Sequence, residues 1–298
     1  MFGMPVALLA ALLAASLAWS GLDLLRKLLV EKIRPLALLF LLTAGCLPLF
    51  AAWAAVEGRW QIAPSYAWPA LGSILLNIGA NLAFFESVRL SPLSVTVPLL
   101  SLTPAFAALA AIPLVGEWPG WMRGAGILLV VLGALLLHLG TGRGAGGLAL
   151  GEAPRAFLRD RGSLLMVLVA LLWSVAISCD KLAMERSSAP VHAVILCGGI
   201  ALATLGVLAA RGRLADLRAV RQTPWTLPAA LVVSSLALGL QLVVLQGVLV
   251  GVVETVKRGI GNTAAVALGR AVFGETVTGG KVAGVLLMAA GVALVMLA

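Results

Sequence analysis

An acid and two adjacent bases stand inside a long apolar stretch of the sequence, in the segment VVETVKRGIGN. Glu254, Lys257 and Arg258 are spaced i, i+3 and i+4, so on a helix the acid can meet either base on one face. A charge in membrane hydrocarbon costs roughly 2.5–3.5 kcal/mol or more. One acid neutralises one base, and the remaining cation has an anion as its natural complement. The alternative is an ion pair that only stabilises the helix.

Two further groups of polar side chains recur at helical spacing. One group is Ser73, Asn77 and Asn81, each four residues apart. The other is Ser234, Ser235 and Gln241. Spacings of four place side chains on one helix face. Such stripes either hydrogen-bond neighbouring membrane helices or line a polar cavity, and both interpretations stay open.

The composition excludes a water-soluble globular protein. The 298 residues are 61% hydrophobic and only 11% charged, whereas soluble domains carry about 25% charged residues. The net charge of +9 comes from bases scattered singly between apolar runs, which indicates membrane topology rather than nucleic-acid binding. The three cysteines are scattered, and His138 and His192 have no second ligand nearby in the sequence, so no disulfide, metal or cofactor is expected.

Apolar stretches of about 20 residues, the length that crosses a bilayer, recur along the chain. They are Val6–Leu25, Leu36–Val56, Trp68–Val88, Leu93–Val115, Met122–Leu139, Leu164–Ala183, Val191–Ala210, Leu227–Gln246, Val248–Phe273 and Gly280–Leu297. The first lacks the basic start and cleavage site of a signal peptide. The sequence therefore predicts an all-α integral membrane protein with about ten transmembrane helices. Gly140–Gly162 reads as a Gly-rich linker with a short basic helix.

The two halves of the chain repeat each other. LAWSGLDLLRKLL at Leu17–Leu29 matches LLWSVAISCDKLA at Leu171–Ala183, and LVGEWPGWMRGAG at 114–126 matches VFGETVTGGKVAG at 272–284. We therefore expect one five-helix repeat over residues 1–140, a linker over 141–162 and a second repeat over 163–298. Five is odd, so the repeats must be inverted, as in secondary transporters with a site at the repeat interface.

These motifs resemble the drug/metabolite transporter superfamily, in its ten-helix EamA-domain branch. The resemblance rests on the Trp-Ser opening and lysine of each repeat, the Gly-Glu step after helices four and nine, and the Gly-rich helix that follows. It covers nearly the whole chain except the linker. One departure is that Val256 and Asn262 replace the Pro98 and Pro104 of the first repeat.

The resemblance implies where a substrate would bind. Helices three and eight of the family face a central path, and plastid phosphate translocators, distant members, bind phosphate through an adjacent Lys-Arg in helix nine. Lys257-Arg258 is similar to that pair, although helix four lacks the further lysine of those translocators. The expected substrate site comprises Lys257, Arg258, Glu254, Asn77, Asn81, Gln241, Trp19, Ser20, Trp173 and Ser174.

The expected function is secondary transport of a small carboxylated or phosphorylated anion by alternating access. The alternative is an exporter of amino acids or amphipathic drug-like compounds, in which the helix-nine charges are structural. The sequence has no H-E-x-x-H and neither histidine lies near a plausible serine nucleophile, so an enzyme is not expected. Its partners are then a small-molecule substrate and the bilayer.

The remaining charges predict how the chain is oriented in the membrane and where its ion pairs lie. Fifteen Lys and Arg residues fall in loops of one face and four on the other, which predicts a plasma (inner) membrane protein with both termini outside. The eukaryotic relatives imply the opposite orientation. Asp23, Arg26, Asp180 and Lys181 are expected at the interface, as snorkelling charges or gate pairs, with Asp23 or Glu254 a candidate for proton coupling.

Two acids and a set of glycines are expected to serve packing. Glu117 and Glu275 close helices four and nine and are expected to be structural. Helices five and ten carry glycine at every seventh residue, at Gly126, Gly133 and Gly140 and at Gly284 and Gly291. Such seams let helices approach closely. They either join the two repeats or form a homodimer face.

Overall fold

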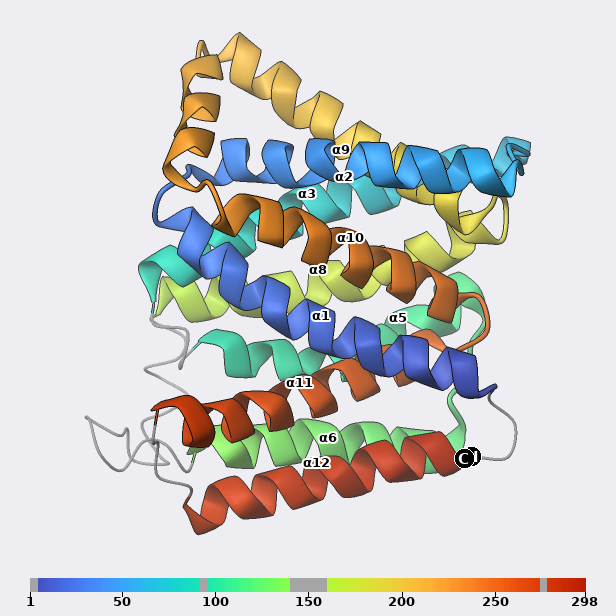
Figure 1. Cartoon of the computed structure of the whole chain (residues 1–298). Helices are drawn as coiled ribbons and strands as arrows, with labels where there is room; N and C mark the ends of the chain where they lie inside the picture. Colours follow the sequence, from blue (N-terminus) through green and yellow to red (C-terminus); the bar gives the residue numbers. More distant parts are fainter. Residues whose placement is uncertain (1–4, 92–95, 140–159, 274–277) are drawn as a thin grey trace.

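The computed structural model describes residues 5–91, 96–139, 160–273 and 278–298, and all regular structure in these ranges is helical (Figure 1). The first half contains α1 (Val6–Val30), α2 (Pro35–Glu57), η1 (Pro64–Tyr66), α3 (Ala67–Leu90), η2 (Val97–Leu102), α5 (Thr103–Val115) and α6 (Gly120–Leu139). The second contains α8 (Arg161–Met184), α9 (Ala189–Ala210), η3 (Leu214–Gln222), α10 (Thr226–Leu245), α11 (Val250–Phe273) and α12 (Gly279–Leu297).

The predicted all-α membrane fold is confirmed. Within the described residues, 7 helices are long and apolar enough to cross a membrane: α1, α2, α3 with η1, α8, α9, α10 and α12. Two shorter apolar helices span Leu99–Val115 and Gly120–Leu136. The remaining long helix, α11, carries the charged segment. The count of ten spans stays a prediction.

The helices pair across the two halves of the chain (Figure 1). In the figure α6 and α12 lie side by side at one end of the bundle, and α2 and α9 lie at the other. Between them α1 packs on α10 and α11, while α8 packs on α3 and α5. Exchanging α1 with α8, α3 with α10 and α5 with α11 reproduces the same neighbours. This exchange is what two repeats related by a two-fold axis require.

Helix ends follow local sequence signals. Pro35 and Pro190 stand in the first turns of α2 and α9, where no backbone N–H is needed. Gly58 and Gly116 end α2 and α5 with φ of 68° and 76°, a left-handed conformation that favours glycine. Asp160 caps α8 by accepting a hydrogen bond of 2.8 Å from the backbone N–H of Ser163.

The fourth predicted span is not one uniform α-helix. A 3-10 segment, η2, precedes α5, and residues 92–95 lie outside the described residues. Pro104 has no N–H to donate to the carbonyl of Leu100, four residues back. That carbonyl instead accepts the backbone N–H of Thr103 and, at 2.5 Å, its hydroxyl. The missing donor thus accounts for the tighter turn before α5.

Two predicted boundaries also shift. Helix α1 continues to Val30 instead of ending at Leu25, which places Arg26 within the bundle. Helix α8 begins at Arg161, so the last residues of the predicted linker are already helical. The rest of the linker with its predicted short basic helix (140–159), and likewise Glu275, lie outside the described residues.

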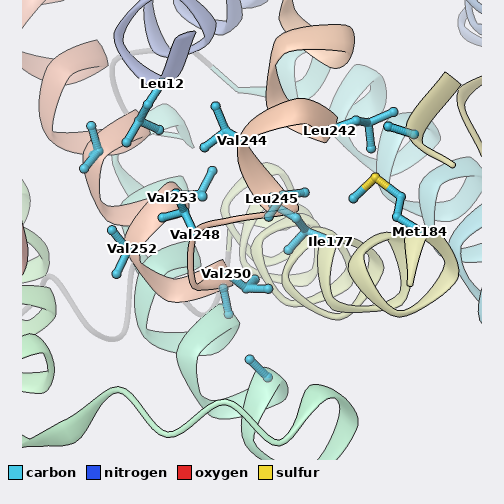
Figure 2. Packing of buried hydrophobic residues seen from close by; sticks show 14 of the residues in the cluster. Leu12, Ile177, Met184, Leu242, Val244, Leu245, Val248, Val250, Val252 and Val253 are labelled. Atoms are coloured by element: carbon cyan, nitrogen blue, oxygen red, sulfur yellow. The ribbon is translucent and has the colours of Figure 1, made fainter. Parts of the chain in front are cut away.

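A cluster of buried aliphatic side chains fixes the turn between α10 and α11 (Figure 2). Leu245 and Val248 pack there with Leu12 of α1 and Ile177 of α8. Dense packing of this kind holds neighbouring backbone in one place. It therefore sets the start of α11, the helix that carries the charged segment.

Polar contacts hold the same turn. The Glu117 carboxylate accepts a hydrogen bond of 2.7 Å from the backbone N–H of Val250 and forms an ion pair with Lys181. Lys181 also donates to the carbonyl of Val248 at 2.8 Å. Glu117 thus has the structural role expected from the sequence. Lys181, which the sequence suggested as a snorkelling charge or part of a gate pair, is partly buried beside the carboxylate of Glu117, just after the end of α5.

The glycine seam joins α6 to α12 inside the chain. A Cβ atom added at Gly126 would lie 2.7 Å from the carbonyl oxygen of Gly291, and one at Gly133 would lie 2.7 Å from that of Gly284. Real Cβ atoms do not approach backbone so closely. These glycines are therefore occupied by packing between the two halves. A homodimer face cannot use the same surface.

Candidate functional site

A cavity of about 110 Å³ lies between helices from both halves of the chain. Its charged lining consists of Asp23, Arg26, Asp180, Glu254, Lys257 and Arg258. Its polar and aromatic lining includes Trp19, Thr43, Cys46, Asn77, Asn81, Trp173, Cys197, Ser234 and Gln241. Since a water molecule occupies about 30 Å³ in the liquid, the cavity has room for a few waters or one small chemical group.

Eight of the ten residues predicted for the substrate site line this cavity, and Ser20 and Ser174 do not. The Ser20 hydroxyl donates to the carbonyl of Ser16 at 3.0 Å. The Ser174 hydroxyl donates to the carbonyls of Ala170 at 2.5 Å and Thr103 at 3.1 Å. Both serines hydrogen-bond to helix backbone, and Ser174 connects α8 to α5. The part that all ten play in substrate binding stays a prediction.

Lys257 is fully engaged by its neighbours. It forms an ion pair with Glu254, which is 2% exposed, and donates to the amide oxygen of Gln241 at 3.2 Å. Its Nζ atom also lies 5.2 Å from the ring centroid of Trp19, within the range of a cation–π contact. Glu254 of α11 therefore neutralises Lys257. Arg258 is the base left over.

Two guanidinium groups share a single carboxylate at this end of the cavity. Arg258 lies 3.9 Å and Arg26 lies 3.6 Å from the oxygens of Asp23, both too long for a hydrogen bond. Arg258 Nε and Arg26 Nε and Nη1 are buried and have no hydrogen-bond partner among the described residues. Trp19 and Trp173 flank Arg26 at 5.4 and 6.0 Å from their ring centroids. We call this group of Asp23, Arg26 and Arg258 the cationic end.

Asp23 and Arg26, which the sequence suggested as snorkelling charges or gate pairs, lie inside the bundle. Arg26 is only 7% exposed and, like Asp23, lines the cavity. The physical reason is the length of α1, whose helix continues past both charges. With Asp23 as one acid and two arginines as bases, the cationic end carries a net formal charge of +1.

A second buried network lies on the α8 side of the cavity. Asp180, 4% exposed, accepts hydrogen bonds at Oδ1 from Ser73 and, at 3.1 Å, from the ring Nε2 of His192. The other ring nitrogen of His192 lies 3.0 Å from the Tyr66 hydroxyl. Asn77 donates to Ser73 Oγ at 3.1 Å. We call this chain of Tyr66, His192, Asp180 and Ser73 the acidic network.

The acidic network was not expected from the sequence. Asp180, suggested there as a snorkelling charge or part of a gate pair, is buried within the bundle, and α8 continues past it to Met184. His192 looked isolated in the sequence, but Asp180 and Tyr66 contact both of its ring nitrogens. One sequence signal was available, since the repeat match aligns Arg26 with Asp180, each directly before a lysine. The contact with Tyr66 joins residues 126 positions apart and left no local signal.

The sequence profile of the EamA-like transporter family matches residues 5–139, which include Trp19, Arg26, Asn77 and Asn81 of the cavity. This match covers a little under half of the chain, and these residues are similar to the EamA-like transporter family. Together with the apolar helices, the match indicates a multi-pass membrane protein that transports small molecules, as the motifs of the sequence predicted.

Comparison with solved structures finds the same fold over the whole chain. In all, 29 chains of solved structures match. One crystal structure covers 99% of this chain and 98% of its own, with a TM-score of 0.70 and 19% sequence identity. At that identity the likeness establishes the fold alone. No curated protein matches the chain.

Proposed function

We propose that this protein is a secondary carrier of small carboxylated or phosphorylated anions. The observation that carries the proposal is the cationic end, where Arg26 and Arg258 share the single carboxylate of Asp23. Buried donors without partners are costly, and each demands a physical account. A bound carboxylate or phosphate supplies the missing acceptors and the missing negative charge.

The chemistry of arginine favours this class of ligand. A guanidinium grips a carboxylate or phosphate through two parallel hydrogen bonds, which a lysine cannot do. Lys257 already has Glu254 and Gln241 as partners, so it acts on the substrate less directly. We therefore assign the first contacts to Arg26 and Arg258, and Asn81 lines the same cavity.

The position of the cavity supports transport by alternating access. The cavity lies between helices of the two proposed repeats, 1–140 and 163–298, whose pairing is exchanged by a two-fold operation. Its volume of about 110 Å³ is below the 300–1,000 Å³ of ordinary ligand pockets, so it must widen to admit a metabolite. The excess of bases on one face supports a plasma (inner) membrane location with that face in the cytoplasm and both termini outside.

One observation favours the alternative, an exporter of amino acids. Asp180 lines the same cavity and could receive an ammonium group while an arginine holds the carboxylate. However, Ser73 and His192 already donate to Oδ1 of Asp180. A zwitterion would need both ends of the cavity at once. An anion needs only the cationic end.

The test is thermal stability of the detergent-purified protein against phosphates, carboxylates, amino acids and organic cations. A ligand that binds only the folded state raises the apparent melting temperature by mass action. Arg258→Gln and Lys257→Gln are measured beside Arg218→Gln, which removes the same charge from an exposed position in η3.

We expect anions to stabilise the parent and Arg218→Gln, to act weakly on Lys257→Gln and to have no effect on Arg258→Gln. Stabilisation by amino acids or organic cations alone would contradict the proposal and favour the exporter. Equal anion effects in all four proteins would show that the anions bind elsewhere.

A further inference from the structure

The acidic network connects the cavity to one face of the bundle. Tyr66 ends η1 and His192 lies in the first turn of α9, next to the loops that precede both elements. These loops are joined by a hydrogen bond of 2.8 Å from the Ala63 N–H to the carbonyl of Arg186. From this face the network leads through His192 to Asp180 at the cavity wall.

We propose that the Asp180–His192 pair is the proton-binding site of this carrier and that the proton binds together with the anion. The inference rests on the proposed anion transport and names its coupling ion. The sequence suggested Asp23 or Glu254 for this role. The geometry points instead to Asp180, because its partners are neutral.

The buried acids of the cavity differ in their partners. Glu254 is held by Lys257, and Asp23 lies between two arginines, so both have a cation beside them. Asp180 contacts only Ser73 and His192 within the described residues. A carboxylate in a membrane interior without a cation is expensive. A proton on the pair removes that cost, since it either converts His192 to a cation or neutralises Asp180.

The other groups that face the pair do not replace the proton. Cys179 and Cys197 are buried thiols near Asp180, on α8 and α9. Lys181, the next residue along, is turned to Glu117. From α3, α2 and α10 the described residues that line the cavity contribute only uncharged groups. The charged residues that line the cavity from the two remaining helices are Asp23 and Arg26 of α1 and Glu254, Lys257 and Arg258 of α11.

The hydrogen bonds of His192 suit proton transfer. When Nε2–H donates to Asp180, Nδ1 can accept the hydrogen of the Tyr66 hydroxyl. A proton that arrives from the Tyr66 side binds Nδ1, and the proton on Nε2 can then pass to Oδ1 of Asp180. His192 is left as the other neutral tautomer, so the pair gains one proton and no atom is lost. The charge of the pair rises by one unit in either form.

Charge balance links this proton to the anion. Three acids and three bases line the cavity, so its formal charge is zero when Asp180 is ionised and His192 is neutral. The proton raises the charge to +1, which a singly charged anion then neutralises. Each ligand therefore favours binding of the other, and the coupling is reciprocal. Competition between proton and substrate is instead expected for an amine that binds Asp180 directly.

A structural path connects the two sites. Ser73 donates to Asp180 and at the same time accepts from Asn77, which lines the cavity. A change of charge at Asp180 therefore acts on Asn77 through the Ser73 hydroxyl, which contacts both side chains.

The test is nuclear magnetic resonance of the full chain labelled with ¹⁵N-histidine. The chain has 2 histidines, and His138→Gln identifies the signals of His192. We expect the ¹⁵N shifts of His192 to change as the pH falls from 8 to 5, whether the proton rests on the ring or on Asp180. Saturating citrate or inorganic phosphate should raise the midpoint pH of this change by about one unit. That shift corresponds to about tenfold tighter anion binding by the protonated form.

Variants separate the proton site from the anion site. Arg258→Gln should keep the pH-dependent change of His192 and lose the effect of citrate. In Asp180→Asn the change should move to lower pH, because the imidazolium loses its carboxylate. Wild-type protein alone carries the main result, so a poorly folded Asp180→Asn would not decide the matter.

Three outcomes count against the account. Constant His192 shifts from pH 5 to 8 in folded protein would overturn the proton site. Thermal stabilisation shows whether citrate binds. If citrate binds but leaves the pH of the His192 shift change unaltered, or moves it to lower pH, co-binding of proton and anion is overturned. If His192 responds to pH but no anion stabilises the protein, the proton site stands and the proposed anion function fails.

Discussion

Helices α1 and α8 occupy equivalent places in the two halves, yet their buried charges are treated in opposite ways. Both contain Trp-Ser, and seven residues after the tryptophan one carries Arg26 and the other Asp180. Asp180 receives two hydrogen bonds from neighbouring helices. Arg26 has two buried nitrogens without a partner among the described residues. The fold thus supplies hydrogen bonds to Asp180 and leaves it short only of positive charge, whereas Arg26 lacks hydrogen-bond acceptors that an anion can supply.

At these two residues the halves of the chain differ in hydrogen bonding more than in position. Both residues line one cavity. What distinguishes them is the surrounding helices, since Ser73 and His192 reach Asp180 whereas tryptophan faces flank Arg26. Substitutions on the two sides should therefore affect different properties, which gives the comparison four tests.

The largest effect is expected from removing the partner of Asp180. His192→Leu leaves a buried carboxylate with one hydrogen-bond donor fewer and should lower the free energy of unfolding by about 3 kcal/mol. Tyr66→Phe removes only one neutral hydrogen bond and should cost about 1 kcal/mol. Denaturant unfolding in detergent, followed by tryptophan fluorescence, measures both. Equal stability of His192→Leu and wild type would mean that the network contributes nothing to the fold.

The opposite pattern is expected on the α1 side. Arg26→Met should change the free energy of unfolding by less than about 1 kcal/mol, because an apolar residue removes unsatisfied donors. The same substitution should weaken anion binding about 10- to 100-fold, the loss of one charge-assisted contact. Melting temperature without ligand and a binding titration on the same preparation give the two numbers. A strong loss of stability with unchanged affinity would invert the comparison.

A smaller effect, a gain in anion affinity, is expected when Lys257 loses its ion-pair partner. Glu254→Gln removes the acid that neutralises Lys257 and raises the charge of the cavity by one unit. Anion affinity should rise about three- to tenfold, about 1 kcal/mol, through a second unpaired cation. Calorimetric titration measures the change. Weaker anion binding in Glu254→Gln would show that Glu254 positions Lys257 for the substrate instead of withholding it.

The smallest effect concerns Asp160, a partnered carboxylate outside the membrane spans. Hydrogen bonds from the side chains of Ser163 and Ser91 hold the pKa of Asp160 below its usual value. Its stabilisation is therefore present above the unfolded pKa and is lost as the pH falls through the lower folded pKa. The stability difference between wild type and Asp160→Asn should be small at pH 7 and should shrink as the pH falls below the unfolded pKa of Asp160. A difference that grew on acidification would contradict this sign.

Much of the fold could be predicted because hydropathy and repetition are properties of the sequence itself. Runs of apolar residues indicate where helices cross, and the recurrence of Trp-Ser and lysine indicates the two halves. The pairing of Glu254 with Lys257 was predictable for the same reason, since a helix brings residues three apart together. Local spacing was sufficient for each of these inferences.

The rest depended on contacts between helices. Hydropathy ended α1 before Arg26 because a charge lowers the average, but tertiary packing carries the helix on to Val30. Asp180 and His192 are 12 residues apart on different helices, and no local pattern predicts their hydrogen bond. The unpaired state of Arg26 is likewise a property of its surroundings. Only the structure shows which charged side chains have hydrogen-bond or ion-pair partners.

The most direct measurement is uptake of radiolabelled anion into liposomes that contain the purified protein. The anion is the one that stabilises the protein most, and Arg258→Gln, Arg26→Met and the exposed control Arg218→Gln are compared with wild type and with empty liposomes. The account predicts saturable uptake by wild type and Arg218→Gln, with uptake lost in Arg258→Gln and Arg26→Met. Equal uptake by all four proteins, or transport of amino acids but of no anion, would contradict it.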